Sequence, residues 1–175
     1  DEDRNSVLSY SLVNSGGSKD EGLLSIDSAT GAVNFIAAPN FESPGDLNAD
    51  NTIDFTVMVS DGALSAQSDF TFSITNVNEA PTISSASFSI AEQSTAVGSI
   101  SASDPDASAT LTYSLASGSA AVDDAKFSIN SSTGAVSFLA TPNFESPSDN
   151  GLDNVYNFTV NVSDGSLSSS EAVAV

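Results

Sequence analysis

The sequence IDFTVMVSDG, residues 53–62, is the clearest indication of the fold, and it recurs as YNFTVNVSDG at residues 156–165. Apolar residues alternate with other residues through each copy, so that every second side chain points to the same face of an extended chain. Each copy ends in Asp-Gly, a pair typical of tight turns between strands. The pattern predicts a half-buried strand followed by a turn.

The duplication extends well beyond this strand. When residues 1–72 are shifted by 103 positions, they fall on residues 104–175, and 34 of the 72 pairs are identical. Among the matched blocks, TGAV at 30–33 returns at 133–136, and PNFESP at 39–44 returns at 142–147. The chain therefore contains a copied module, which favours a function based on an array over one based on a single cleft.

Alternation with a period of two recurs along both copies, and turn signals separate the alternating segments at intervals of roughly ten residues. We interpret the chain as all-β, with each module forming a sandwich of two sheets. The alternating sets are Leu8, Tyr10 and Leu12; Val33 and Phe35; Ile53 to Val59; Phe70, Phe72 and Ile74; Phe88 and Ile90; Leu111, Tyr113 and Leu115; Val136 and Phe138; and Tyr156 to Val162. The repeated aromatic residues are expected in the core: Tyr10, Phe35, Phe41, Tyr113, Phe138 and Phe144.

Residues 73–103 occur only once, so the ends of the repeat and of the sequence do not coincide. We expect one module at 1–78 that lacks its N-terminal strands and a nearly complete one at 79–175, both cut from a longer tandem protein. The sequence NVNEAP, residues 76–81, lies between them, and its proline favours a short extended connector.

Acidic residues dominate the charge, with 23 Asp and Glu against three Lys and Arg, for a formal net charge of −20. Such a surface repels nucleic acid and anionic membranes, so nucleic acid is excluded as a direct partner. No apolar run approaches the roughly 18 residues of a membrane span, and we expect no direct membrane insertion.

The chain has no cysteine, histidine or tryptophan. Disulfides, sites for soft metals and most pairs of nucleophile and base are thereby excluded. Paired carboxylates alone can hydrolyse glycosides, but no cleft motif accompanies them. We therefore expect no enzyme activity.

Acidic and amide residues of the repeated blocks cluster at strand ends and in turns. Calcium takes six to eight oxygen ligands from carboxylates, amides and carbonyls, which loops at one pole of a sandwich supply if several converge. Calcium is therefore the expected cofactor. The alternative interpretation is that these residues are turn formers and solubilising charges, because Asp and Asn stabilise turns locally.

The order of these motifs resembles the cadherin repeat in its bacterial cadherin-like form. The matching elements of the second copy are the strand end IAE (90–92), the pair Asp104 and Asp106 before LTY (111–113), the stretch from Phe127 to Gly134, the triplet NFE (143–145), and VSDG (162–165). The segment NVNEAP resembles a shortened form of the linker that ends each cadherin repeat. The resemblance covers nearly the whole chain and implies tandem Greek-key β-sandwiches of the cadherin and immunoglobulin kind.

The resemblance also implies which residues bind calcium. At the junction between the modules, the implied ligands are Asn40, Glu42, Asn76, Asn78, Glu79, Asp104, Asp106 and Asp164. Asp1, Asp3 and Asp61 are implied ligands toward a preceding repeat, and Glu92, Asn143 and Glu145 toward a following one. Asparagine replaces the first acid of the Asp-x-Glu triplet and the linker lacks its aspartates, so we expect fewer or weaker ions than in the family pattern.

A further set of acids follows each PNFESP block. Asp46 and Asp50 reappear as Asp149 and Asp153. Their spacing in the first copy is similar to that of an EF-hand loop, although the glycine and glutamate of that motif are missing. We interpret these loops as adjunct calcium ligands, with a turn-forming role as the alternative.

The resemblance implies a calcium-rigidified extracellular repeat of a bacterial surface adhesin or filament, which mediates adhesion between cells or to a surface. The expected partners are neighbouring repeats and another chain, through homophilic contact or strand exchange at the open sheet edge of the first module. Two alternatives stay open. One is a polysaccharide-binding module, which exposed aromatic residues would favour, although the chain has only three tyrosines and no tryptophan. The other is a passive spacer.

Overall fold

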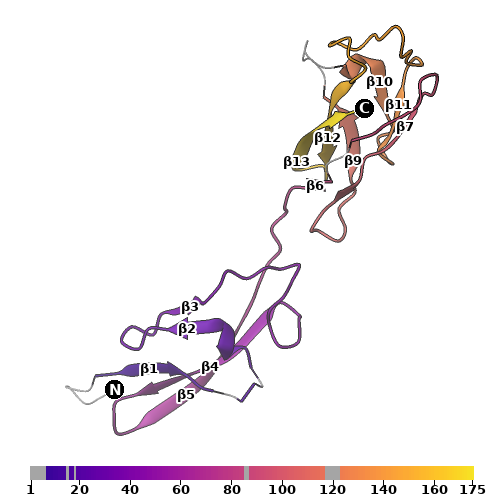
Figure 1. Ribbon diagram of the computed structural model, residues 1–175. Helices are drawn as coiled ribbons and strands as arrows, with labels where there is room; N and C mark the ends of the chain where they lie inside the picture. Colours follow the sequence, from indigo (N-terminus) through magenta and orange to yellow (C-terminus); the bar gives the residue numbers. More distant parts are fainter. Residues whose placement is uncertain (1–6, 15, 18, 85–86, 117–122) are drawn as a thin grey trace. The chain divides into compact units, whose positions relative to one another are not determined.

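A computed structural model describes residues 7–14, 16–17, 19–84, 87–116 and 123–175 of the chain (Figure 1). These residues fall into two compact units, Asp1–Val77 and Asn78–Val175. Within the described residues, no helix is both long and apolar enough to cross a membrane. Each unit is built from strands and one short 3-10 turn, which confirms the all-β prediction.

The first unit packs a three-stranded sheet against a two-stranded one (Figure 1). The larger sheet has the order β1 (Ser9–Leu12), β4 (Thr52–Ser60), β5 (Ser65–Ser73), and the smaller pairs β2 (Leu24–Ile26) with β3 (Val33–Phe35). A 3-10 turn, η1 (Glu21–Leu23), leads into β2. Leu24, Ile53 and Phe55 form the buried centre between the sheets.

The second unit repeats this arrangement and adds strands. One sheet has the order β10 (Phe127–Ile129), β11 (Ala135–Phe138), β7 (Ala96–Ser99), and the other has the order β13 (Ser168–Ala174), β12 (Asn157–Ser163), β9 (Thr112–Leu115). A small third sheet pairs β6 (Thr82–Ile83) with β8 (Ala102–Ser103), and the turn η2 (Asp124–Lys126) precedes β10. The chain crosses between the two large sheets from β9 to β10 and again from β11 to β12, as Greek-key sandwiches do.

The repeated sequence folds in the same way in both units. In each unit the repeated Thr-Gly turn joins two paired strands, β2 and β3 in the first unit and β10 and β11 in the second. The glycine of the turn has a positive φ, 73° at Gly31 and 67° at Gly134. A side chain is strained in this left-handed conformation, which explains glycine at both positions. The alternating sequences at 53–62 and 156–165 form most of β4 and β12, and Ile53, Phe55 and Phe158 face the core.

Three details differ from the sequence-based expectations. Phe88 and Ile90 lie in a segment with only one isolated bridge, from Ser87 to Ala174, and not in a ladder strand, although both side chains pack against the core. Phe144 is 65% exposed and not a core residue, because it lies in the loop after β11. Phe70 is 50% exposed, because the described residues place no layer over the outer part of β5.

The other repeated aromatics agree better with the prediction. Phe138 is buried, and Tyr10, Phe35, Phe41 and Tyr113 are half-buried. Among the residues that the structure describes, the second unit also has a larger core cluster than the first, with nine buried apolar residues: Ile100, Phe127, Val136, Phe138, Tyr156, Phe158, Val160, Val162 and Val173.

Candidate metal centre

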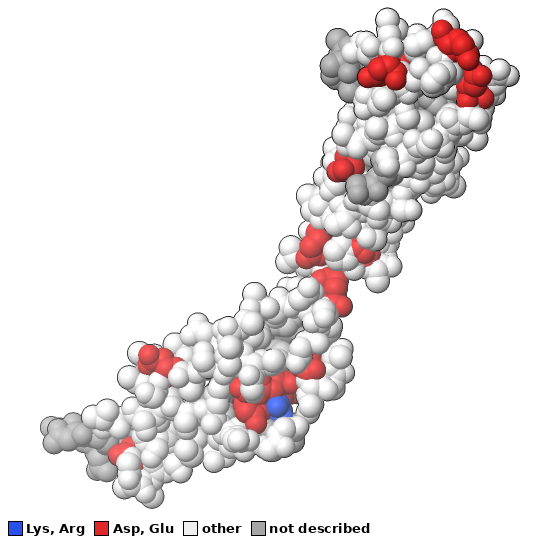
Figure 2. Space-filling model, in the orientation of Figure 1, with Lys and Arg blue, Asp and Glu red and all other residues white. Residues whose placement is uncertain are grey.

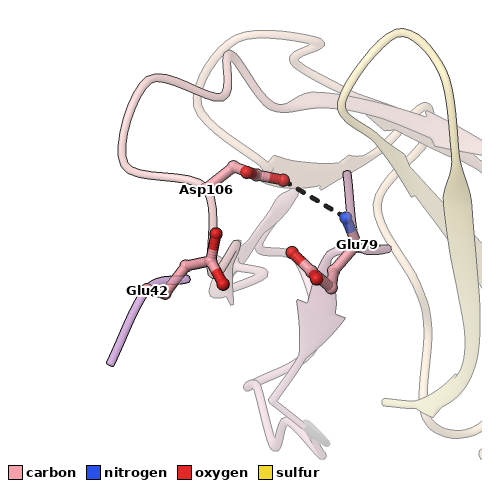
Figure 3. A group of neighbouring side chains, drawn as sticks. All are labelled: Glu42, Glu79 and Asp106. Atoms are coloured by element: carbon pink, nitrogen blue, oxygen red, sulfur yellow. Dashed lines mark hydrogen bonds between the residues drawn. The ribbon is translucent and has the colours of Figure 1, made fainter. Parts of the chain in front are cut away.

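Three segments of the second unit meet at its N-terminal pole. They are the segment at 78–79, the loop between β8 and β9, and the turn between β12 and β13. The Asn78 Nδ2 donates to Asp164 Oδ2 at 2.7 Å, and the Glu79 N–H donates to Asp106 Oδ2 at 3.2 Å, the bond drawn in Figure 3. Together with the bonds from Asn78 Nδ2 to the Glu79 carbonyl and from the Asp106 N–H to Asp104 Oδ1, they join Asn78, Glu79, Asp104, Asp106 and Asp164 in one polar network.

Asp164 is held in place by the backbone of its own turn. Its Oδ1 accepts the N–H groups of Ser166 at 2.6 Å and Leu167 at 2.7 Å. The Leu167 and Ser166 N–H groups, followed by the Asn78 side chain, lower the pKa of Asp164 below its ordinary value. Asp164 therefore presents a fixed negative charge at neutral pH.

Asp104 supplies the strongest indication that a cation fits here. Its Oδ1 accepts the Asp106 N–H at 2.9 Å, which closes a turn in the loop after β8. Its other carboxylate oxygen, Oδ2, is buried and has no hydrogen-bond partner among the described residues. A buried carboxylate oxygen without a donor is costly unless a cation satisfies it. This donor set consists only of oxygen atoms, which is the chemistry that calcium prefers.

The predicted ligands of the first unit show local roles. Asn40 Oδ1 accepts the N–H groups of Glu42 at 2.8 Å and Ser43 at 3.1 Å, which fixes the loop after β3. Asn76 is exposed in the segment that follows β5. Glu42, also labelled in Figure 3, belongs to this unit.

The turn at Asp61 has the same construction as the turn at Asp164. Asp61 Oδ1 accepts the N–H groups of Ala63 at 2.8 Å and Leu64 at 2.6 Å. The Leu64 and Ala63 N–H groups lower the pKa of Asp61. Asp1 and Asp3, the other predicted ligands of this set, lie outside the described residues.

Glu92 and the triplet at 143–145 meet in the second unit. Glu92 Oε2 accepts the Phe144 N–H at 3.0 Å, and Asn143 Oδ1 accepts the Ser146 N–H at 3.0 Å. Glu145 is exposed. The structure thus brings Glu92 to the loop that carries Asn143 and Glu145, while their role as calcium ligands stays a prediction.

The repeated loops after PNFESP use their aspartates as hydrogen-bond acceptors. Asp46 Oδ2 accepts the Asp50 N–H at 2.8 Å, and Asp149 Oδ2 accepts the Asp153 N–H at 2.9 Å. Both loops contain residues in the left-handed conformation at equivalent positions, Ala49 and Asn51 in one and Leu152 and Asn154 in the other. The carboxylates satisfy the backbone of an otherwise strained loop, which is the turn-forming role, while the adjunct calcium role stays a prediction.

Sequence reasoning missed a buried aspartate that anchors each of these loops. Asp123 Oδ1 accepts the Asn150 N–H at 2.9 Å and its Oδ2 accepts the Asn157 N–H at 3.0 Å. Asp20 makes the equivalent bonds to Leu47 and Asp54. Both aspartates are buried. The available signal was their identity in the two copies, each at the start of the short turn that leads into the next strand.

Basic groups are scarce on the described surface, as Figure 2 shows for one face. Lys19 Nζ contacts Asp69 Oδ1 at 2.6 Å and donates to Thr56 Oγ1 at 2.7 Å. This ion pair and the Thr56 hydroxyl lower the pKa of Asp69. Lys19 is thus held within the first unit by its own partners.

Comparisons with known proteins agree with this fold. The bacterial Ig domain family matches residues 78–175, more than half of the chain. Human protocadherin-24 EC1-2 (form II) has a similar structure, with a TM-score of 0.66 and 20% identity over 99% of this chain and 82% of that chain. Human CDH23 EC21-23 has a TM-score of 0.54 and 20% identity over 98% of this chain and 58% of that one. No sequence among curated proteins matches this chain significantly.

The fold and the acidic pole together define a tandem β-sandwich protein of the immunoglobulin and cadherin-like class. The chain belongs to the bacterial Ig domain family.

Proposed function

We propose that this chain is part of an extracellular adhesion protein in which calcium, bound where one repeat meets the next, stiffens the array. The observation that carries the proposal is the polar network at the N-terminal pole of the second unit. It joins the segment at 78–79 to Asp106 and Asp164, and it includes the buried, unsatisfied Asp104 Oδ2. The cadherin-like fold supports the proposal, since the cadherin resemblance implies calcium ligands at these positions.

The mechanism is electrostatic. Glu79, Asp104, Asp106 and Asp164 place several negative charges in one network, and like charges at short range repel one another. A bound calcium ion offsets this repulsion. Because calcium takes six to eight oxygens, we propose that Asn40 and Glu42 of the first unit and Asn76 supply further ligands. An ion shared in this way would tie the two units together.

The remaining predicted ligands belong to the same scheme. We propose that Asp61, with Asp1 and Asp3, forms the equivalent pole of the first unit, and that Glu92, Asn143 and Glu145 contribute to a junction with a following repeat. Asp46, Asp50, Asp149 and Asp153 are proposed as adjunct ligands only.

The test is a thermal melt of the full chain in millimolar calcium, in excess chelator and in magnesium. A ligand that binds only the native state increases the free energy of unfolding, by about 2.7 kcal/mol when its free concentration is one hundred times its dissociation constant. The melting temperature rises as a result. We expect calcium to raise the melting temperature and magnesium to raise it much less. Small-angle scattering in the same buffers measures whether calcium changes the dimensions of the chain.

Two variants make the test specific. Asp106→Asn removes a network carboxylate and should abolish most of the calcium effect. Asp27→Asn is the matched control, because Asp27 also accepts two backbone N–H groups in a turn, those of Ala29 and Thr30, but is no predicted ligand. A calcium effect that Asp106→Asn leaves intact would overturn the assignment of these residues, and the absence of any calcium effect would overturn the proposed function.

A further inference from the structure

The loop between β11 and β12 holds the only Asn-Gly pair of the sequence, Asn150 and Gly151. An asparagine side chain can be attacked by the backbone nitrogen of the next residue, and glycine hinders this attack least because it has no Cβ. The equivalent loop of the first unit has Leu47 and Asn48 at these two positions. The second unit therefore carries a reactive pair that the first unit lacks.

The structure leaves the reacting groups of this pair accessible. Asn150 is exposed to solvent. Among all the residues that the structure describes, none forms a hydrogen bond with the Asn150 side-chain amide or with the Gly151 N–H. The pair occupies the middle of a turn, which the Leu152 N–H closes by donating to the Asp149 carbonyl at 3.3 Å. Neither the attacking nitrogen nor the side-chain amide therefore has to give up a hydrogen bond to the protein before they react.

The backbone around Asn150 is tied to the core of the second unit. The Asn150 N–H donates to Oδ1 of the buried Asp123 at 2.9 Å. Asp149 accepts two more N–H groups of the loop, that of Leu152 at its carbonyl and that of Asp153 at its Oδ2. These last two bonds span the backbone that follows residue 150, so a change in its length at this point disturbs the hydrogen bonds that hold the loop.

We propose that the pair is a site of slow covalent self-modification, with water as the only co-reactant. The Gly151 nitrogen bonds to Cγ of Asn150, and its proton leaves with the side-chain nitrogen as ammonia, so that a five-membered succinimide ring forms. Water then opens the ring at one of its two carbonyl carbons, adding OH to the carbon and H to the nitrogen. Opening at Cγ yields aspartate with the original backbone. Opening at the backbone carbonyl carbon yields isoaspartate, whose backbone runs through Cβ and Cγ.

The two products affect the loop differently. Both add a carboxylate to a loop that already contains Asp149 and Asp153, in a chain with a net charge of −20, and like charges repel one another. Isoaspartate also lengthens the backbone after residue 150 by a methylene group. The bonds from the Leu152 and Asp153 N–H groups to Asp149 then lose their present geometry. The second unit should therefore lose stability with time, through a reaction for which the equivalent loop of the first unit has no Asn-Gly pair.

The test is peptide mapping by mass spectrometry of the full chain after increasing times in mildly alkaline buffer. We expect the mass gain of NH2 replaced by OH to appear first at Asn150 and to accumulate there severalfold faster than at Asn48. Asn48 is the matched internal control, because it is exposed in the equivalent loop but precedes Ala49. Methylation by an isoaspartyl methyltransferase identifies the isoaspartate product. The reaction needs no calcium, so we expect the same result in excess chelator.

Two variants separate the chemistry from its consequence. Asn150→Gln keeps the amide but requires a six-membered ring for the same attack, so conversion at this position should be lost. This variant is preferable to a change at Gly151, where an added Cβ would lie 3.1 Å from Asp153 Oδ1. Asn150→Asp carries the new charge on an unaltered backbone. Hydrogen exchange at the Leu152 and Asp153 amides should therefore be faster in the isoaspartate-containing chain than in fresh Asn150→Asp.

Conversion at Asn48 as fast as at Asn150 would overturn the proposal, since the reaction would then not depend on the Asn-Gly pair. Persistence of the conversion in Asn150→Gln would also overturn it. So would a folded chain that stays unconverted under conditions that convert a synthetic peptide of residues 147–154. If the isoaspartate-containing chain exchanges at Leu152 and Asp153 as slowly as the fresh chain, the proposed effect on the loop is wrong.

Discussion

The two units carry the same alternating pattern, but they bury it to different extents. Val160 and Val162 of β12 have no exposed surface, whereas Val57 and Val59, at the same positions of β4, are only half-buried. Val173 is 2% exposed, and Phe70 at the equivalent position is 50% exposed. Residues 55–60 of β4 and 158–163 of β12 differ at one position, so the residues of these two strands do not cause the difference between their valines.

The cause is the segment that includes Phe88, Ile90 and β7. In the second unit this segment packs over both sheets and pairs with β11. The described residues of the first unit include no equivalent layer. A period of two therefore indicates which face of a strand turns inward, whereas the extent of burial depends on whether another segment covers that face.

The largest expected difference between the units comes from truncating one repeated phenylalanine. Phe138 is buried and its ring centroid lies 4.4 Å from that of Phe127, whereas Phe35 is half-buried. Phe138→Ala should cost about 3–5 kcal/mol of unfolding free energy. Phe35→Ala should cost about half of that or less.

These costs can be measured in the intact chain by denaturant-dependent hydrogen exchange, which reports each unit separately. Equal costs at the two positions would contradict the comparison, because they would mean that Phe35 is packed as tightly as Phe138 in solution.

A second pair of variants should show no difference between the units. Asp20 and Asp123 each accept two backbone N–H groups through a buried carboxylate. Replacing either with alanine removes two part-buried hydrogen bonds to a carboxylate, at a cost of about 2–4 kcal/mol. We expect similar costs, because the covering segment plays no part in these hydrogen bonds. Chemical denaturation with unit-resolved exchange checks this, and a difference as large as that of the phenylalanine pair would contradict it.

The glycines of the repeated Thr-Gly turn should differ moderately. Alanine at either position is strained by the positive φ, at about 1 kcal/mol. A Cβ on Gly134 would also lie 2.6 Å from the Ile100 carbonyl oxygen, whereas a Cβ on Gly31 meets only the Tyr10 ring, at 3.0 Å. Since a backbone carbonyl yields less than a side chain, Gly134→Ala should be the more destabilising by about 1–2 kcal/mol. Thermal unfolding of the two variants compares them, and an equal loss would mean that the segment around Ile100 adjusts freely.

The smallest expected effect concerns the pKa values of Asp61 and Asp164. Backbone N–H groups lower both values, and Asn78 contributes only to Asp164. Asn78→Ala should therefore raise the pKa of Asp164 and leave that of Asp61 unchanged. An NMR titration of the carboxyl carbons measures both pKa values. An unchanged pKa of Asp164 would mean that Asn78 does not donate a hydrogen bond to this carboxylate.

The sign of the pH dependence follows from these lowered pKa values. A carboxylate with a lower pKa in the folded state stabilises the fold above its unfolded pKa, about 3.9 for Asp, and loses this contribution as the pH falls through its folded value. Both turns should therefore lose stability below about pH 4.

Much of the fold was predictable from the sequence, because the alternation at 53–62 and the Asp-Gly and Thr-Gly turns are local signals. The buried roles of Asp20 and Asp123 were not, because their partners lie 27 and 34 residues away. The exposure of Phe144 could not be predicted either, because the sequence around an aromatic residue in a loop has no periodicity that indicates where its side chain points.

For the candidate metal site, the residues implied by the resemblance include all five that meet at the pole of the second unit: Asn78, Glu79, Asp104, Asp106 and Asp164. Distance along the chain concealed their proximity, since Asn78 and Asp164 are 86 residues apart. The order of motifs suggested these residues, and the structure adds the hydrogen bonds that join them and the unsatisfied oxygen of Asp104.

Calcium binding at the N-terminal pole of the second unit can be tested most directly by hydrogen exchange of the full chain with and without calcium, resolved to single amides. We predict slower exchange at Glu79, Asp106, Ser166 and Leu167, with no change at Ala29 and Thr30 of the matched turn. Slower exchange only in the loops at 46–51 and 149–154, or no change at any described amide, would contradict it.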